Sequence, residues 1–323
     1  MTRFLVLGWL VAASAMAAEP PPPRSRAEVE AVLAQAPPAP PPELLRPLHI
    51  VLIADQKDHG PGEHDYPLWQ KRWRILLGGQ DGSQAAEPQV NLYGPPPAGQ
   101  SKEALAGGPK VKVTTAWQWP SPEQLKSADL VVMFCYRSGG ARRTWSDQRV
   151  KELEAYLARG GGFVVIHSAT YTLGDLKQPE GKRVVDLTGL VFGQSIQVRH
   201  GPMAVKIAAP NHPICRGLPP VIQWVDEPYW PPVGDPNAVE VLATSEETIA
   251  KGSNQKKPQP MFWTYQPVKG RVFGCVPGHF NWTFDDPYFR LLLLRGMAWA
   301  AGESPYRFDG LTLRGLALPA KSG

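Results

Sequence analysis

The sequence lacks the features that mark several large classes of protein. It has only 3 Cys in 323 residues, an odd number with no Cys-x-x-Cys pair, so no disulfide framework is implied. No interior apolar run reaches about 18 residues, which excludes a multispan membrane protein. The formal net charge is +5, and basic residues cluster only at Arg142-Arg143 and Lys256-Lys257, so we expect no nucleic-acid partner.

Proline and glycine are abundant instead, with 36 Pro and 31 Gly. Such a composition without a period is typical of disordered chains, and the glycines lack the three-residue period of collagen. The same chain has 11 Trp, 10 Phe and 9 Tyr, and 43% of its residues are hydrophobic. Because a disordered chain cannot bury large aromatic side chains, we expect a folded core.

Many of the prolines fall in the first fifty residues, ahead of the expected core. Residues 1–18 combine a charged start at Arg3, an apolar run over residues 4–13, and small residues at Ala15 and Ala17, the pattern of a secretory signal peptide. We therefore expect a periplasmic or secreted protein with no membrane span in the mature chain. A Pro-rich leader follows over residues 19–47, with a short helix predicted at 25–35 that either straps onto the domain or serves as a tether.

Apolar runs and helical periodicity alternate through the first half of the chain. Strands are predicted at residues 48–54, 110–115, 129–136 and 163–167, and helices at 66–77 and 146–159. Strands that are apolar on both faces and alternate with helices indicate an α/β fold with a Rossmann- or flavodoxin-like, doubly wound and mostly parallel sheet. Further strands are predicted at 203–207, 239–243, 261–265 and 271–276, with a helix at 287–301 capped by Asp286. We place the domain at residues 48–302 and a C-terminal tail at 303–323.

Histidines occur in three of the four loops where a doubly wound sheet binds its ligands, beyond the carboxyl ends of the strands. His59 and His64 follow the first strand, His167 follows the fourth and His279 follows the last. Neutral imidazoles near carboxylates can bind a divalent metal such as Zn²⁺, so these four are the candidate metal ligands. The candidate oxygen donors are Glu63, Asp65 and Glu227.

The same histidines could act without a metal. His167 and His279 could perform acid–base catalysis with Glu227, or could simply form hydrogen bonds within their loops. No nucleotide cofactor is expected. Nucleophilic catalysis is disfavoured, because Ser168 lacks the flanking glycines of a nucleophile elbow and Cys275 lies inside a predicted strand.

Acidic and aromatic residues interleave over residues 224–230. Carboxylates bind sugar hydroxyls and aromatic rings pack on the C–H faces of sugars, so this segment favours a small-molecule carbohydrate partner. The alternative is ordinary packing in a Trp-rich chain. The predicted substrate-binding residues are Tyr229, Trp230, Trp282, Arg137 and His200.

Seven segments carry a family resemblance. They are residues 57–64, 160–169, 211–214, 226–229, 277–279, 284–287 and 295–302. Together, and in this order, they resemble the ThuA-like (trehalose utilisation) domain family over about residues 48–302. The resemblance implies a fold similar to class I glutamine amidotransferases, a role in disaccharide or keto-sugar utilisation, and, as in some members, a metal site with His167 and His279 on the matching motifs.

Two departures from the family pattern bear on function. Tyr136-Arg137-Ser138 stands where a family variant has another histidine, and His167-Ser168 stands where amidotransferases carry a Cys nucleophile. Three hypotheses follow. The protein is an exported enzyme acting on a carbohydrate or keto-sugar, a non-catalytic carbohydrate-binding module, or an amidotransferase-like hydrolase that lacks its nucleophile.

Overall fold

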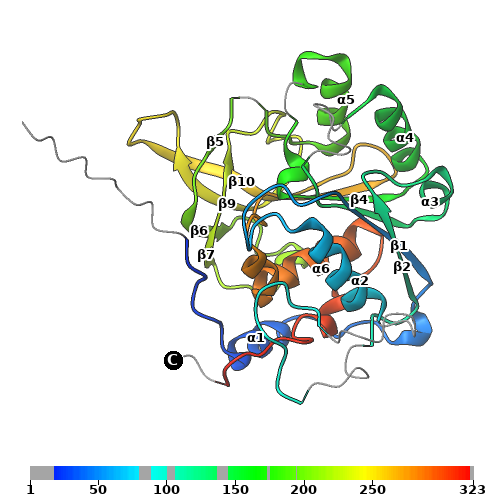
Figure 1. Ribbon diagram of the computed structural model, residues 1–323, viewed down its shortest axis with the longest axis vertical. Helices are drawn as coiled ribbons and strands as arrows, with labels where there is room; N and C mark the ends of the chain where they lie inside the picture. The colour runs from blue at the N-terminus through cyan, green and yellow to red at the C-terminus, as the bar shows by residue number, and fades with distance from the viewer. Residues whose placement is uncertain are drawn as a thin grey trace, which may run out of the picture.

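A nine-stranded sheet with helices on both faces forms the centre of the computed structural model, which describes residues 18–79, 89–99, 106–136, 145–172, 175–193 and 195–320 (Figure 1). The strands lie in the order β2-β1-β3-β4-β11-β10-β9-β6-β7. No helix among these residues is long and apolar enough to cross a membrane.

The first five strands of this order are mutually parallel. They are β2 (Val111–Trp117), β1 (Leu48–Ala54), β3 (Leu130–Met133), β4 (Gly162–Ile166) and β11 (Arg271–Cys275). Their order, with the chain reversing direction across the sheet between β1 and β3, is the flavodoxin-like one. β3 and β4 are buried along their whole length, as the two-sided apolar runs predicted, and the α/β fold class is confirmed.

The remaining four strands extend the sheet in antiparallel fashion. They are β10 (Lys256–Tyr265), β9 (Glu240–Thr248), β6 (Gly201–Ile207) and β7 (Val221–Asp226). β9 and β10 run well past the predicted ranges, because their distal parts form a projecting hairpin (Figure 1, yellow) without a continuous apolar run. A separate two-stranded sheet pairs β5 (Gln197–Val198) with β8 (Tyr229–Trp230).

Helices form the outer layers of the fold (Figure 1). On one face lie α2 (Tyr66–Gly78) and α6 (Pro287–Ala300), and on the other lie α3 (Pro122–Ser127), α4 (Asp147–Ala158) and α5 (Pro179–Thr188). As predicted, the Asp286 side chain caps α6. Shorter 3₁₀ helices are η1 (Pro42–Leu44), η5 (His167–Thr170), η6 (Asp175–Lys177), η7 (Pro213–Cys215), η8 (Asn281–Asp285) and η9 (Pro305–Leu311).

The leader and the C-terminal segment both pack on the domain. Helix α1 (Arg26–Leu33) begins with a capping box from Ser25 and buries Val29 in the main core. The Arg26 amide donates to the Pro319 carbonyl at 2.8 Å, so the two ends of the described chain lie side by side. The C-terminal segment adds Phe308 to the core and is therefore part of the folded domain.

Candidate metal and acid–base site

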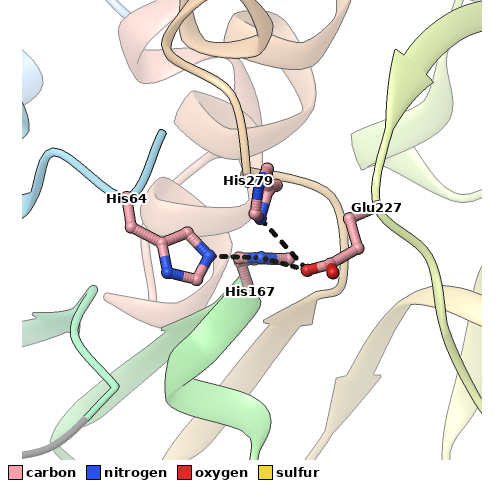
Figure 2. A group of neighbouring side chains, drawn as sticks. All are labelled: His64, His167, Glu227 and His279. Carbon is pink, nitrogen blue, oxygen red and sulfur yellow. Dashed lines mark hydrogen bonds and ion pairs between the residues drawn. The ribbon is translucent and has the colours of Figure 1, made fainter. Parts of the chain in front are cut away.

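Four ionisable side chains from distant parts of the chain meet at one edge of the sheet (Figure 2). His64 comes from the loop after β1, His167 begins η5 directly after β4, His279 lies in the loop after β11, and Glu227 follows β7. One ligand atom from each lies within 4.8 Å of those of the others. All four side chains are buried. The structure therefore brings together three of the four predicted histidines with one of the three predicted oxygen donors.

The atoms facing one another are close enough to share one ion. His64 Nε2 lies 2.9 Å from His167 Nε2, and Glu227 Oε2 lies 3.3 Å from His167 Nε2 and 3.1 Å from His279 Nδ1. Donors of a tetrahedral metal site with bonds of about 2.0–2.1 Å are separated by about 3.3 Å. The spacing thus fits a small divalent cation.

Hydrogen bonds on the far sides of the rings orient the lone pairs toward the centre. His167 Nδ1 lies 2.6 Å from the Val276 carbonyl, which can only accept, so Nδ1 carries the proton. His64 Nδ1 lies 3.0 Å from an oxygen of the Asp58 carboxylate and donates in the same way. Both Nε2 atoms of the neutral rings therefore present lone pairs to one another. A carboxylate or carbonyl behind each imidazole is the usual support of a metal-binding histidine.

Protonation of the histidines does not readily replace a bound cation at this cluster. Burial, together with repulsion from the neighbouring histidines, lowers the pKa of His64 to about 3 despite its bond to Asp58. Neither ring nitrogen of the buried His279 makes a well-formed hydrogen bond within the described part of the chain. Converging lone pairs and an unsatisfied buried imidazole are the features that a bound divalent cation would neutralise.

The carboxylates around the cluster stay ionised. Burial alone would raise the pKa of Asp58, but hydrogen bonds from His64 and His59 outweigh it and bring the value to about 2. Burial likewise opposes ionisation of Glu227, but the neighbouring imidazoles of His167 and His279 outweigh it and hold its pKa far below the usual range. Tyr66, whose hydroxyl donates to Asp58 at 3.1 Å, completes this support.

Two of the ligand candidates occupy strained backbone positions. His64 has φ 42° and His167 has φ 48°, the left-handed region that residues other than glycine rarely adopt. The His64 amide donates to the His279 carbonyl at 2.9 Å, which joins the two loops directly. Such strain persists only where the surrounding structure demands it, and it commonly marks functional sites.

Asp226, which sequence reasoning missed, positions the site without touching its centre. Its fully buried carboxylate accepts from the backbone amides of Glu227, Gly278 and His279 at 2.7, 3.1 and 3.0 Å, and from the Thr283 hydroxyl. The carboxylate thereby ties the end of β7 to the loop after β11. The signal in the sequence was its place beside Glu227 in the family-like segment 226–229.

Two histidines lie at the rim of the cluster. His200, half exposed, places Nε2 at 2.9 Å from Glu227 Oε1, so the other Glu227 oxygen faces the centre. His59 is exposed and pairs with Asp58 at 2.8 Å, in a second group with His64. The candidate donor Glu63 lies 3.8 Å from His279 Nε2. Asp65, the third candidate donor, instead caps helix α2.

The predicted substrate contacts are distributed unevenly. The buried Tyr229 hydroxyl lies 2.9 Å from His167 Nε2. Trp230 is also buried, and its indole donates to the Thr248 carbonyl. Trp282 stacks on Phe280, with ring centroids 4.1 Å apart, and both line a groove with Glu63 and His200. Arg137 lies outside the described residues.

The cysteines offer no nucleophile. Cys135, Cys215 and Cys275 are all buried free thiols, as expected. Burial raises the pKa of Cys275 well above its usual value and that of Cys215 to about 12, so neither forms a thiolate readily. The position directly after β4 is held by His167.

The fold and the site together define a flavodoxin-like α/β protein with a His/Glu cluster at the carboxyl edge of its parallel strands. A family model described as ThuA, trehalose utilisation, matches residues 59–300. The chain therefore belongs to the ThuA family.

Two solved structures show the same fold. A ThuA-like protein from Parabacteroides merdae is 19% identical, with a TM-score of 0.52, and the match covers 80% of this chain and 92% of that one. A ThuA-like protein from Bacteroides uniformis is 18% identical, also with a TM-score of 0.52, over 80% of this chain and 96% of that one. No curated protein matches the sequence significantly.

Proposed function

We propose that this protein is an exported, metal-dependent enzyme that performs acid–base chemistry on a carbohydrate or keto-sugar. His64, His167, His279 and Glu227 would hold one divalent cation such as Zn²⁺. The observation that carries this proposal is the approach of two imidazole lone pairs to 2.9 Å beside a buried carboxylate. Without a cation, the Tyr229 hydroxyl can donate to the His167 lone pair, and the lone pair of His64 Nε2 still faces it.

The cation and the side chains around the cluster would have different roles in the reaction. When bound, a divalent cation supplies Lewis-acid polarisation of a carbonyl or hydroxyl oxygen. Asp58 and the Val276 carbonyl keep the rings of His64 and His167 in the required tautomers. His200 orients Glu227 and, being half exposed, lies open to solvent.

The carbohydrate substrate is supported by the family description and by the groove beside the site. The matching family model is described as trehalose utilisation. Trp282 and Phe280 give the groove an aromatic wall, and Glu63 gives it an oxygen acceptor. These are the groups that bind the C–H faces and hydroxyls of sugars. Export rests on the predicted signal peptide, most of which lies outside the described residues.

A non-catalytic carbohydrate-binding module is the second candidate. It would use the same aromatic wall but would not need three histidines with oriented lone pairs. The two functions are distinguished by one measurement: only the enzyme would convert a carbohydrate to product when the protein has bound metal.

The experiment measures metal and product together. Metal-free protein is titrated with Zn²⁺ by calorimetry, and oxidised and unoxidised disaccharides are screened for products by mass spectrometry. We expect one site per chain, lost in His167→Ala and His279→Ala. His59 lies at the rim of the cluster and is not one of these four ligands, so His59→Ala should still bind one Zn²⁺ per chain. Failure of the wild type to bind Zn²⁺ or another divalent ion would refute the metal site, and sugar binding without turnover would favour the module.

A further inference from the structure

The Pro-rich leader is fixed to the domain beside the groove. Arg24 Nε lies 2.8 Å from an oxygen of the Asp286 carboxylate, and its Nη2 donates to the Gln223 carbonyl at 3.0 Å. The guanidinium also stacks over the Tyr288 ring at 4.3 Å. Asp286 is the residue that caps helix α6, so the leader is anchored to a rigid part of the core.

The leader residues ahead of Arg24 run along the aromatic wall. Pro20–Pro23 line a hollow together with Tyr93 and Trp282. Trp282 also lines the groove beside the site, and Ala18 and Glu19 are part of the same lining. A run of four prolines is stiff and has no backbone N–H, so little conformational entropy is lost in holding it against a surface.

The groove connects this leader with the metal site. Its volume is about 770 Å³, within the range of about 300–1,000 Å³ typical of small-molecule sites. Of its lining residues, Glu63 lies 3.8 Å from His279 and His200 lies 2.9 Å from Glu227. Ala18 and Glu19 of the leader belong to the same lining. A groove of this volume has room for more than one sugar ring, with one of them beside the cluster.

The charges of the groove restrict what can bind. Its described lining residues include the carboxylates of Glu19 and Glu63 and the imidazole of His200, and no Lys or Arg. With the ionised carboxylates of Asp58 and Glu227 at the cluster, these two carboxylates outnumber the charges of a divalent cation. The site therefore disfavours a phosphate or carboxylate on a ligand, while its carboxylates accept hydrogen bonds from hydroxyls.

On this basis, and resting on the proposed function, we propose that Glu19, held in place by leader residues 20–24, forms part of the wall of the substrate groove. The leader is then a specificity element that selects uncharged saccharides of at least two sugar units. Arg24 is the positioning residue that holds this wall in place, and Glu19 contributes the wall's hydrogen-bond acceptor.

Calorimetric titration with glucose, trehalose and trehalose 6-phosphate in the presence of Zn²⁺ tests this. We expect the wild type to bind trehalose at least tenfold more tightly than trehalose 6-phosphate. Arg24→Met should raise the Kd for trehalose about tenfold, which is equivalent to one lost anchoring contact. It should change the Kd for glucose less than twofold. Arg26→Met, which removes only an exposed pair with Glu30, is the matched control and should bind as the wild type does.

Glu19→Gln leaves the contacts of Arg24 intact, so it tests the groove even if Arg24→Met fails to fold. Glu19→Gln should reduce the ratio of the Kd for trehalose 6-phosphate to the Kd for trehalose. The leader proposal is overturned if Arg24→Met binds trehalose like the wild type, if it weakens glucose equally, or if the phosphorylated sugar binds as well as trehalose. A wild type that binds Zn²⁺ but no sugar overturns the carbohydrate function, and the leader proposal with it. Unchanged trehalose binding in a folded Arg24→Met protein removes the leader proposal alone.

Discussion

Asp226→Asn tests whether a buried carboxylate outside the metal cluster holds the site together. The substitution keeps shape and size but replaces one acceptor oxygen with an NH₂ group. If the remaining oxygen still serves Glu227 and His279, the new NH₂ group faces the Gly278 amide, which loses its acceptor. Thr283 can rotate its hydroxyl to accept instead, so one contact rather than two is lost.

The expected loss of stability follows from the single lost hydrogen bond of the Gly278 amide. A hydrogen bond to a charged group contributes about 1.5–3 kcal/mol, and a buried unsatisfied amide costs about 1–3 kcal/mol more. We expect the free energy of unfolding to fall by about 3–5 kcal/mol. For a domain of this size the thermal midpoint should drop by about 6–12 °C. Because the Gly278–His279 backbone would shift, Zn²⁺ affinity should fall about 10- to 100-fold.

The assay is thermal and urea unfolding of metal-free protein, followed by Zn²⁺ titration. Asp65→Asn is the matched control, because it is also Asp to Asn but Asn caps a helix as well as Asp does. Equal thermal midpoints for Asp226→Asn and Asp65→Asn, with unchanged Zn²⁺ affinity, would refute the positioning role of Asp226.

Three further predictions concern stability away from the site. Arg295→Met leaves the partly buried Asp309 carboxylate uncompensated and should cost about 3–5 kcal/mol in urea unfolding. Gly296→Ala, normally stabilising within a helix, should cost about 1–3 kcal/mol because the added Cβ meets the Phe273 ring at 2.6 Å. The pKa of His49 is lowered by burial and then by a nearby lysine, so acidification through pH 6.5 favours unfolding. His49→Gln should therefore narrow the difference in urea midpoint between neutral and mildly acidic pH.

Each of these has an internal check. The double variant Arg295→Met with Asp309→Leu should recover part of the lost stability, because the Ile214 and Arg216 carbonyls that Arg295 also reaches stay without this donor. No recovery would show that the ion pair is not the cause. Gly310→Ala, where the added Cβ meets nothing within 4 Å, should unfold near the wild-type midpoint. An identical pH dependence in His49→Gln and the wild type would contradict the assignment to His49.

Local patterns predicted the elements of the parallel half well. Residues 48–54 were predicted as a strand because they form a near-continuous apolar run, and β1 has those bounds, with all but one of its side chains buried. Asp286 and Pro287 predicted the start of α6 because capping is a local interaction. β7 was missed, because its apolar and polar residues do not follow its alternation of buried and exposed positions: Val221 is exposed and Asp226 is buried.

The candidate site was predicted only in outline. A topological rule placed His64, His167 and His279 at one edge of the sheet, and the structure brings their rings together. The same reasoning could not choose among Glu63, Asp65 and Glu227. Glu227 reaches the cluster from the end of β7, in the antiparallel half of the sheet, and local patterns did not predict that strand.

The sequence by itself therefore determined the fold class, the family and the histidines that could form a site, because periodicity, caps and short motifs are local properties of the chain. Only the tertiary structure decided which carboxylate joins them, which ring nitrogens bear lone pairs, and how Asp226 and the leader support the groove. These depend on contacts between residues as much as 262 positions apart, as in the pair of Arg24 with Asp286. Such contacts leave no local pattern, because they form only when the sheet has brought its distant loops to one edge.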